Sequence, residues 1–390
     1  MANKAPTDGD LTQDGTPSVI IPTTSSVSES KPTILHLGND IRWNHDLYAE
    51  LSQKFNIIRT YSTGREDFKR ALQDKTWGDF VGIYRPFWNT GGEMGNWDAE
   101  LMYLLPPSIS HEQLPTDTNS PLLPKSCRVF ASAGAGFDWV DTKLLAEHDV
   151  VYCNSASACT ESVADAALFL ILAVYRLFSW SCQAAHSCDS QRFKDAMSNI
   201  AAVTHNPNGS TLGIVGLGKI GHRIAQKAKA FEMKLVYHDV VRMEERAKEV
   251  GAGWCETLEE LLGKSDCVVL ATPFNGDVLL SEKEFGQFKK GARLVNIARG
   301  MLVDEDALIK ALDDGALSAA GLDVHAGEPH VNKTLAERRN IMMLSHTAGA
   351  SVESHVGFER LGMENLLGWL KNGKAGLVSP VNLQWFKGDR

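Results

Sequence analysis

Residues 211–221 read Thr211-Leu212-Gly213-Ile214-Val215-Gly216-Leu217-Gly218-Lys219-Ile220-Gly221, an apolar run followed by glycines in the spacing G-x-G-x-x-G. The apolar run predicts a buried strand, and the glycines predict a tight turn into a helix. Such a turn brings backbone N–H groups and the positive end of the helix dipole close to a pyrophosphate. The run Lys234–Asp239 predicts the next strand and ends in an acid where a ribose diol would be held. The alternative interpretation is a tight turn without a ligand.

Composition and charge exclude several classes of protein. The chain has 390 residues, of which 43% are hydrophobic and 22% charged, so we expect two or three globular domains. The net charge of -9 argues against nucleic acid or an anionic membrane as the main partner. The 7 cysteines form no C-x-x-C pair, which predicts reduced thiols and a cytoplasmic location. The most apolar run, Ala166–Val174, is too short to span a membrane and predicts a buried helix.

The chain before residue 211 begins with a polar segment. Residues 1–32 are rich in Ser, Thr, Pro, Asp and Gly, so we expect a flexible tail that buries little apolar surface. From Thr33 on, apolar runs alternate with helical segments such as Arg65–Gln73 and Asp141–His148. This alternation predicts a parallel sheet with helices on both faces. The expected strands are Thr33–Leu37, Phe55–Tyr61, Phe80–Tyr84, Arg128–Ser132 and Val150–Asn154.

Two loops follow the third and fourth of these strands, at the edge where parallel sheets bind ligands. The loop Ala133–Trp139 is glycine-rich and is predicted to present N–H groups to a carboxylate, or else to be an ordinary turn. The loop Arg85–Trp97 holds three large aromatic side chains. They line an apolar pocket in one interpretation, and pack against a second domain in the other.

The middle and the second half of the chain predict a second α/β unit. Thr160–Phe178 is expected to be one long helix with Thr160 as its N-cap, and Ser179–Gly209 a polar connection with little regular structure. A helix over Val352–Leu370 is expected to return to the first domain. The resulting domains are residues 33–158 plus 350–390, and residues 159–349, with a cleft between them. Six strands are expected in the second unit, at Leu212–Val215, Leu235–His238, Cys267–Ala271, Arg293–Ile297, Ala319–Leu322 and Ile341–Leu344.

Three ionisable residues follow strands of this second unit and suit the reduction of a 2-oxo acid. Arg299 offers a planar cation for a carboxylate, and His346 offers a proton donor that titrates near neutral pH. Glu328 supplies a carboxylate that would orient the imidazole and favour its charged form. Alternatives remain for each of the three. Arg299 could instead be a surface cation near Asp304, Glu328 could be an acid at the start of a helix, and His346 could be a core or cap histidine. His325 and His330 are competing candidates for the histidine role, because they flank Glu328.

The combined motifs resemble the D-2-hydroxyacid dehydrogenases, which are NAD(P)-linked enzymes. The matching stretches occur in the order of that family and are Ala133–Asp138, Gly213–Gly221, Asn296–Gly300, Gly321–Pro329 and Ser345–Gly349. The resemblance implies two doubly wound parallel-sheet α/β domains, a flavodoxin-like substrate domain and a Rossmann-type NAD domain. Glu328 distinguishes the chain from the related formate dehydrogenases, which carry Gln there. Three stretches look most like the fungal branch that includes D-mandelate dehydrogenase, and they are Ala133–Trp139, Asp165–Leu172 and Phe358–Leu361.

The resemblance also implies roles for individual residues. Arg299, Glu328 and His346 would be the catalytic residues, and the backbone of Ala135 and Gly136 would bind the substrate carboxylate together with Arg299 and His346. The residues expected to bind the cofactor are Gly216, Gly218, Lys219, Ile220, Gly221, Asp239, Thr272, Pro273, Ala298 and Asp323.

The cofactor and partners follow from the same residues. Asp239 predicts NAD, with NADP possible because Arg242 follows closely. We expect a small 2-oxo or 2-hydroxy acid as substrate, bulky or aromatic as in the phenylglyoxylate/mandelate pair, and no metal ion. The resemblance implies a homodimer, and no nucleic acid or membrane partner is expected. The rival functions are a glyoxylate/hydroxypyruvate reductase and an NAD-sensing, corepressor-like interaction protein.

Overall fold

Two parallel sheets organise the computed structural model, which describes residues 31–60, 64–87, 96–103 and 122–386. The first sheet has the strand order β2-β1-β3-β4-β5, in which the order reverses between β1 and β3. Its strands are β1 (Thr33–Leu37), β2 (Asn56–Thr60), β3 (Gly82–Arg85), β4 (Val129–Ser132) and β5 (Val151–Cys153). The helices between them are α1 (His45–Lys54), α2 (Arg65–Gln73), α3 (Ala99–Tyr103) and α4 (Thr142–Glu147).

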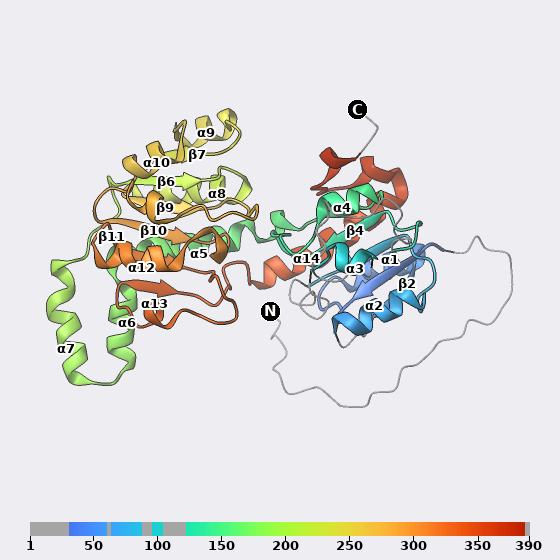
Figure 1. Ribbon diagram of the computed structural model, residues 1–390, viewed down its shortest axis with the longest axis horizontal. Helices are drawn as coiled ribbons and strands as arrows, with labels where there is room; N and C mark the ends of the chain where they lie inside the picture. The colour runs from blue at the N-terminus through green and yellow to red at the C-terminus, as the bar shows by residue number, and fades with distance from the viewer. Residues whose placement is uncertain (1–30, 61–63, 88–95, 104–121, 387–390) are drawn as a thin grey trace. The chain divides into compact units, whose positions relative to one another are not determined.

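The second sheet has seven strands in the order β12-β11-β10-β9-β6-β7-β8 (Figure 1). All of its pairs are parallel, and the order reverses between β6 and β9, which is where doubly wound sheets bind ligands. Its strands are β6 (Thr211–Val215), β7 (Lys234–His238), β8 (Gly253–Trp254), β9 (Cys267–Leu270), β10 (Ala292–Asn296), β11 (Leu317–Leu322) and β12 (Ile341–Met343). Its helices include α8 (Lys219–Ala228), α9 (Glu244–Val250), α10 (Leu258–Lys264), α11 (Glu282–Phe285), α12 (Glu305–Asp313) and α13 (Lys333–Ala336).

The predicted fold class, two doubly wound parallel-sheet α/β domains, is confirmed by these two sheets. The strands lie where the apolar runs predicted them, to within about two residues at each end. The count of six strands in the second sheet was wrong, because β8 was missed. This edge strand has only two residues, too few to produce an alternating pattern. The proposed domain boundaries stay a prediction, and the predicted tail lies outside the described residues except near residue 31.

The long central helix begins earlier than predicted. Helix α5 spans Ala156–Arg176, and its N-cap is Ser155 rather than Thr160. The hydroxyl of Thr160 donates to the carbonyl oxygen of Ala156 at 3.1 Å, so it sits inside the first turns of the helix. Among the described residues, α5 alone has the length and composition to cross a membrane. Here it is a core helix that packs against α8 and β11, with ten buried side chains.

The connection predicted after α5 is helical, so that prediction was wrong. Leu177 has a left-handed backbone that ends α5, and α6 (Phe178–His186) and α7 (Ser190–Asn199) follow, with the 3-10 turn η3 (Ile200–Ala202). Helix α6 buries Trp180, whose ring lies 4.2 Å below the Arg339 guanidinium. Asp189 caps α7 by accepting the N–H of Gln191 at 2.7 Å. Most side chains of α7 are polar and exposed, so the sequence of this amphipathic helix was interpreted as an irregular connection.

The last long helix, α14 (Val352–Asn372), packs against strands β3 and β4 of the first sheet (Figure 1). Its fully buried Glu359 ties the helix to the loop after β1. The Glu359 carboxylate accepts backbone N–H groups of Arg42, Trp43 and Asn44 at 2.5, 3.1 and 2.9 Å. A buried carboxylate is tolerated where several donors satisfy it. The chain thus returns to the first sheet after completing the second, as expected.

Candidate active site

The glycine turn between β6 and α8 has the backbone that a bound pyrophosphate requires. Gly216 has φ +94°, a conformation that favours glycine. A Cβ at Gly221 would lie 2.0 Å from the Gly216 carbonyl oxygen, so glycine lets α8 begin this close to the strand. A Cβ at Gly218 would meet nothing within 4 Å, which leaves that face of the turn open. The turn therefore fits a dinucleotide at the N-terminus of α8, whose first residues are Lys219 and Ile220.

Asp239 follows β7 and is held beside the same turn. Its Oδ2 accepts the N–H of Leu217 at 2.8 Å, and its Oδ1 accepts that of Val241 at 3.4 Å. The carboxylate is thus fixed at the strand end where the sequence predicted that a ribose diol would be held. Its contact with a ribose stays a prediction.

A cavity of about 690 Å³ lies between loops of the two sheets. Most of the predicted site residues line it. These are Ala135, Gly136, Ile220, Thr272, Pro273, Ala298, Arg299, Asp323, Glu328 and His346. Five predicted cofactor residues lie outside its lining and belong to the glycine turn or the end of β7. They are Gly216, Gly218, Lys219, Gly221 and Asp239.

Arg299 reaches from the end of β10 to the loop after β4. Its Nε donates to Oδ1 of Asp138 at 2.8 Å, and its Nη1 donates to the Ala298 carbonyl oxygen at 2.8 Å. Its Nη2 lies 1.2 Å from the point that a Cβ at Gly136 would occupy. The alternative of a surface cation near Asp304 does not describe Arg299, because its side chain is only 25% exposed and pairs with Asp138, while Asp304 caps α12.

Two carbonyl groups of the loop that Arg299 contacts accept hydrogen bonds from residues at the start of α5. Gly134 O accepts the N–H of Ser155 at 2.8 Å, and Ala135 O accepts the side-chain amide of Asn154 at 2.8 Å. Gly134 itself has φ +89°, which favours glycine. These bonds fix the peptide planes of the loop next to the guanidinium.

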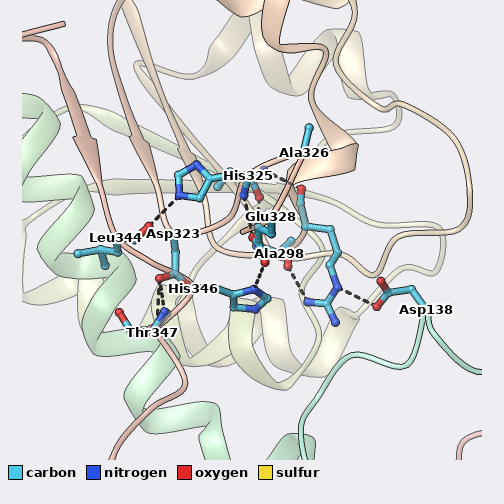
Figure 2. Close-up of polar contacts among 12 residues, drawn as sticks. Asp138, Ala298, Asp323, His325, Ala326, Glu328, Leu344, His346 and Thr347 are labelled. Carbon is cyan, nitrogen blue, oxygen red and sulfur yellow. Dashed lines mark hydrogen bonds and ion pairs between the residues drawn. The ribbon is translucent and has the colours of Figure 1, made fainter. Parts of the chain in front are cut away.

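His346 and Glu328 form a hydrogen-bonded pair (Figure 2). Nδ1 of His346 lies 2.7 Å from Oε2 of Glu328, and each side chain is about one-third exposed. The other carboxylate oxygen, Oε1, accepts the backbone N–H of His325 at 2.8 Å. The carboxylate is therefore held at both oxygens, and its bond fixes which edge of the imidazole faces away from it. The structure brings together the two residues that the sequence predicted as partners.

Asp323 supports the backbone of His346, which has the left-handed φ of +57°. The Asp323 carbonyl oxygen accepts the N–H of His346 at 2.8 Å, and Oδ1 accepts the N–H of Thr347 and Ala348 at 2.9 and 3.0 Å. Burial raises the pKa of Asp323 above its usual value, although the two N–H donors act in the opposite direction. A strained backbone at a candidate catalytic residue is typical of functional sites.

The competing histidines occupy other positions. His325 lines the cavity, but its ring is buried and its Nε2 bonds the Leu344 carbonyl oxygen at 2.8 Å (Figure 2). His330 is exposed and does not line the cavity. The helix-start alternative for Glu328 was wrong, because the next helix, α13, begins only at Lys333.

The aromatic loop after β3 is described only in part, since residues 88–95 lie outside the described ranges. Trp97 packs in the first-sheet core, with its ring 4.8 Å from that of Phe130, and does not line the cavity. Trp97 therefore fits neither interpretation, because it packs within the first-sheet core and not against the second domain. Asn96 does line the cavity, as does Trp139 from the next loop.

Two cavity residues were not singled out from the sequence. Asp138 was quoted only as part of a motif, and Arg85 only as the start of a loop. The Arg85 guanidinium is buried 4.4 Å from the Trp139 ring centroid and donates to Ser132 Oγ at 2.9 Å. Burial lowers the pKa of Arg85 to about 10, so the side chain stays charged at neutral pH. The sequence feature that could have identified Arg85 is the position of an arginine directly at the carboxyl end of an apolar strand.

Comparisons with known proteins show which family the chain is similar to. Residues 168–348 match the family model described as D-isomer specific 2-hydroxyacid dehydrogenase, NAD binding domain. The 4-methyl-2-oxopentanoate reductase A of Aspergillus oryzae is 31% identical over 352 residues, which cover 90% of this chain and 98% of that protein.

Solved structures resemble the chain over most of its length. The holo form of Rhodotorula graminis D-mandelate dehydrogenase has a TM-score of 0.82 and 39% identity, covering 90% of this chain and 98% of that one. An NADPH-dependent glyoxylate/hydroxypyruvate reductase of Sinorhizobium meliloti, solved with NADP and malonate, has a TM-score of 0.69 and 26% identity. The match covers 93% of this chain and 100% of that one.

Proposed function

This chain belongs to the D-isomer specific 2-hydroxyacid dehydrogenase family, and we propose that it interconverts bulky or aromatic 2-oxo acids and D-2-hydroxy acids with NADH. The observation that carries the proposal is the arrangement of Arg299, His346 and Glu328 around one cavity, whose lining also includes Ile220 from the start of α8. In the reducing direction, a 2-oxo acid, NADH and a proton give a 2-hydroxy acid and NAD⁺. Bound NADH supplies the hydride for the 2-oxo carbon. The protein's own residues supply the other requirements.

Arg299 is proposed to hold the substrate carboxylate and to polarise the ketone. Its guanidinium forms a planar fork suited to a carboxylate, and its Nη2 lies against the backbone of Gly136. The N–H groups of Ala135 and Gly136 are proposed as further donors to the same carboxylate, because their loop is fixed by the bonds to Asn154 and Ser155. This set of donors orients the substrate.

His346 is proposed to move the proton. Its Nε2 gives a proton to the developing alkoxide oxygen during reduction and takes it back during oxidation. Oε2 of Glu328 lies 2.7 Å from Nδ1 and so orients the imidazole from the opposite edge. Both residues line the cavity, which supports their action on one substrate.

The preference for a bulky substrate is supported by the lining of the cavity. Phe137, Trp139 and Phe358 contribute aromatic surface to a space of about 690 Å³. The name of the Aspergillus relative, a 4-methyl-2-oxopentanoate reductase, and that of the Rhodotorula structure, a D-mandelate dehydrogenase, point to the same substrates. Glyoxylate/hydroxypyruvate reductase is the second candidate, because that name belongs to the Sinorhizobium structure.

We also propose NAD over NADP as the preferred cofactor, because the Asp239 carboxylate would repel a 2′-phosphate. The Sinorhizobium reductase is NADPH-dependent and was solved with NADP, so both cofactors belong in the test. A cytoplasmic homodimer completes the proposal, to be checked by light scattering and by localisation of the full chain.

A substrate panel tests the proposal directly. The purified full chain is mixed with NADH or NADPH and with glyoxylate, hydroxypyruvate, 4-methyl-2-oxopentanoate, phenylglyoxylate or phenylpyruvate. We expect the largest kcat/KM for a bulky acid with NADH, measured as loss of reduced-nicotinamide absorbance. His346→Ala should lower kcat by about 10²–10⁴-fold and leave NADH binding intact. No turnover across the panel would refute the dehydrogenase, and a preference for the two small acids would favour the second candidate.

A further inference from the structure

Asp138 is an acidic residue inside a site that is expected to bind an anion. It lies on the loop after β4 and lines the cavity with Arg299. Its Oδ1 accepts the Nε–H of Arg299 at 2.8 Å (Figure 2). A carboxylate here repels the carboxylate of a 2-oxo acid, so its presence calls for a compensating role.

Two of the three guanidinium nitrogens of Arg299 are held by hydrogen bonds, and the third lies over Gly136. Nε is bonded to Asp138, and Nη1 is bonded to the Ala298 carbonyl oxygen at 2.8 Å. Since the guanidinium is planar, two bonds to different nitrogens fix its rotation. The third nitrogen, Nη2, then lies over Gly136, 1.2 Å from the position of an added Cβ.

The ion pair contributes little to stability where it stands. The side chains of Arg299 and Asp138 are 25% and 37% exposed, and ion pairs with that much contact with water stabilise folded proteins only weakly. The ion pair matters for geometry instead, because it links an arginine that follows β10 to a loop of the other sheet. The orientation of the guanidinium therefore depends on a residue outside the sheet that carries it.

We propose that Asp138 is a positioning residue that holds Arg299 Nε so that Nη2 faces the carboxylate-binding loop. The inference rests on the proposed function, in which Arg299 binds the substrate carboxylate. The hydrogen bond, and not the negative charge, is what positions the guanidinium. Asn at position 138 can still accept the Nε–H bond, whereas Leu cannot.

The test compares Asp138→Asn and Asp138→Leu with a control, Asp74→Leu, which replaces an exposed aspartate at the end of α2 outside the cavity. The readouts are KM and kcat for the best 2-oxo acid of the panel, and the Kd of oxamate for the NADH-loaded full chain. D138L should raise KM and the oxamate Kd by about 10- to 100-fold, with a smaller loss in kcat, because a misplaced binding group costs about that much. D138N should keep most of the binding that D138L loses, and D74L should match the unchanged protein.

A double-mutant cycle separates positioning from a general structural defect. Arg299→Lys removes the Nε donor, so adding D138L to R299K should raise the oxamate Kd no further. Additive losses in the cycle would refute the inference. So would an oxamate Kd unchanged in D138L, or a D138N that is as impaired as D138L.

The oxamate titration needs no turnover, so it tells the two claims apart. A chain that binds oxamate in the pattern above but reduces no 2-oxo acid would keep the role of Asp138 and lose the proposed dehydrogenase. A chain that reduces the acids but binds oxamate equally in all variants would keep the enzyme and lose the role of Asp138.

Discussion

Oε2 of Glu328 lies 2.7 Å from Nδ1 of His346, while Oε1 of the same carboxylate accepts the backbone N–H of His325 at 2.8 Å. The carboxylate is thus held from two sides and cannot rotate away from the imidazole without losing a bond. The backbone that carries this imidazole is fixed as well, because Asp323 accepts hydrogen bonds from the N–H groups of His346, Thr347 and Ala348. Two neighbouring strand ends therefore fix one imidazole in place before any substrate arrives.

Glu328→Gln should lower the rate of reduction more than the stability of the fold. The Glu328 carboxylate uses one oxygen for Nδ1 of His346 and the other for the His325 N–H, whereas Gln has a single acceptor oxygen and cannot serve both. The imidazole then loses part of the support that orients it, so kcat/KM should fall about 100-fold, the cost of a group misplaced by about 1 Å. The measurement is kcat/KM in both directions, and a value equal to that of the unchanged protein would contradict the pairing.

Gly136→Ala should disable the site through Arg299. An added Cβ would lie 1.2 Å from Nη2, so the guanidinium must leave its position. We expect kcat/KM to fall about 100-fold, because displacement of a binding group by about 1 Å has that cost. Gly253→Ala is the matched control, since its Cβ would meet an ordinary contact at 3.6 Å on the edge strand β8. NADH binding, followed by fluorescence, should be unchanged in both variants, and a G136A protein as active as the control would contradict this placement of Arg299.

Much of the fold and of the candidate site was predictable from the sequence. The strands of both sheets are short apolar runs bounded by turn residues, and the glycine spacing at 216, 218 and 221 places the turn without coordinates. Arg299, Glu328 and His346 were predictable because parallel strands bring their carboxyl ends to one edge.

The failures have physical causes of their own. Helix α7 was missed because most of its residues are polar and it buries only Ala196, while its large apolar side chains, Phe193 and Met197, stay exposed. The bond between Asp138 and Arg299 joins residues 161 positions apart, and no local pattern encodes such a contact. The N-cap at Ser155 was missed because its hydroxyl donates to the Ser132 carbonyl oxygen, at 3.0 Å, instead of capping the helix.

Asp239→Ser should shift the cofactor preference toward NADPH. The carboxylate is held beside the glycine turn by the Leu217 N–H, so it cannot move away from a 2′-phosphate without losing that bond. Removing a like-charge repulsion of about 1.4 kcal/mol changes the ratio of kcat/KM values about tenfold. The ratio of NADPH to NADH use should therefore rise by about that factor, measured with one 2-oxo acid at saturation. Asp266→Ser, in which the replaced acid contacts Thr211 and Lys289 at the other end of the strands, serves as the control.

The buried His36 should make the protein lose stability in mild acid. Its Nδ1 bonds the Tyr48 hydroxyl at 2.8 Å and its Nε2 bonds the Asn39 carbonyl oxygen at 3.0 Å. Burial, helped by nearby Arg59, lowers the pKa of His36 from 6.5 to about 3. Below pH 6.5 His36 is therefore protonated in the unfolded chain but stays neutral in the folded one. The free energy of unfolding is thus highest above that pH and decreases as the pH falls toward 3.

Between pH 7 and pH 5 the free energy of unfolding should fall by about 2 kcal/mol on account of His36. His36→Gln removes the titration while keeping a side chain that can donate and accept, so its urea-unfolding curves should show a loss smaller by about that amount. His186→Gln, which replaces an exposed histidine on α6, should retain the full loss. Equal pH dependence in H36Q and H186Q would mean that His36 is protonated in the folded protein, against the burial and bonding described here.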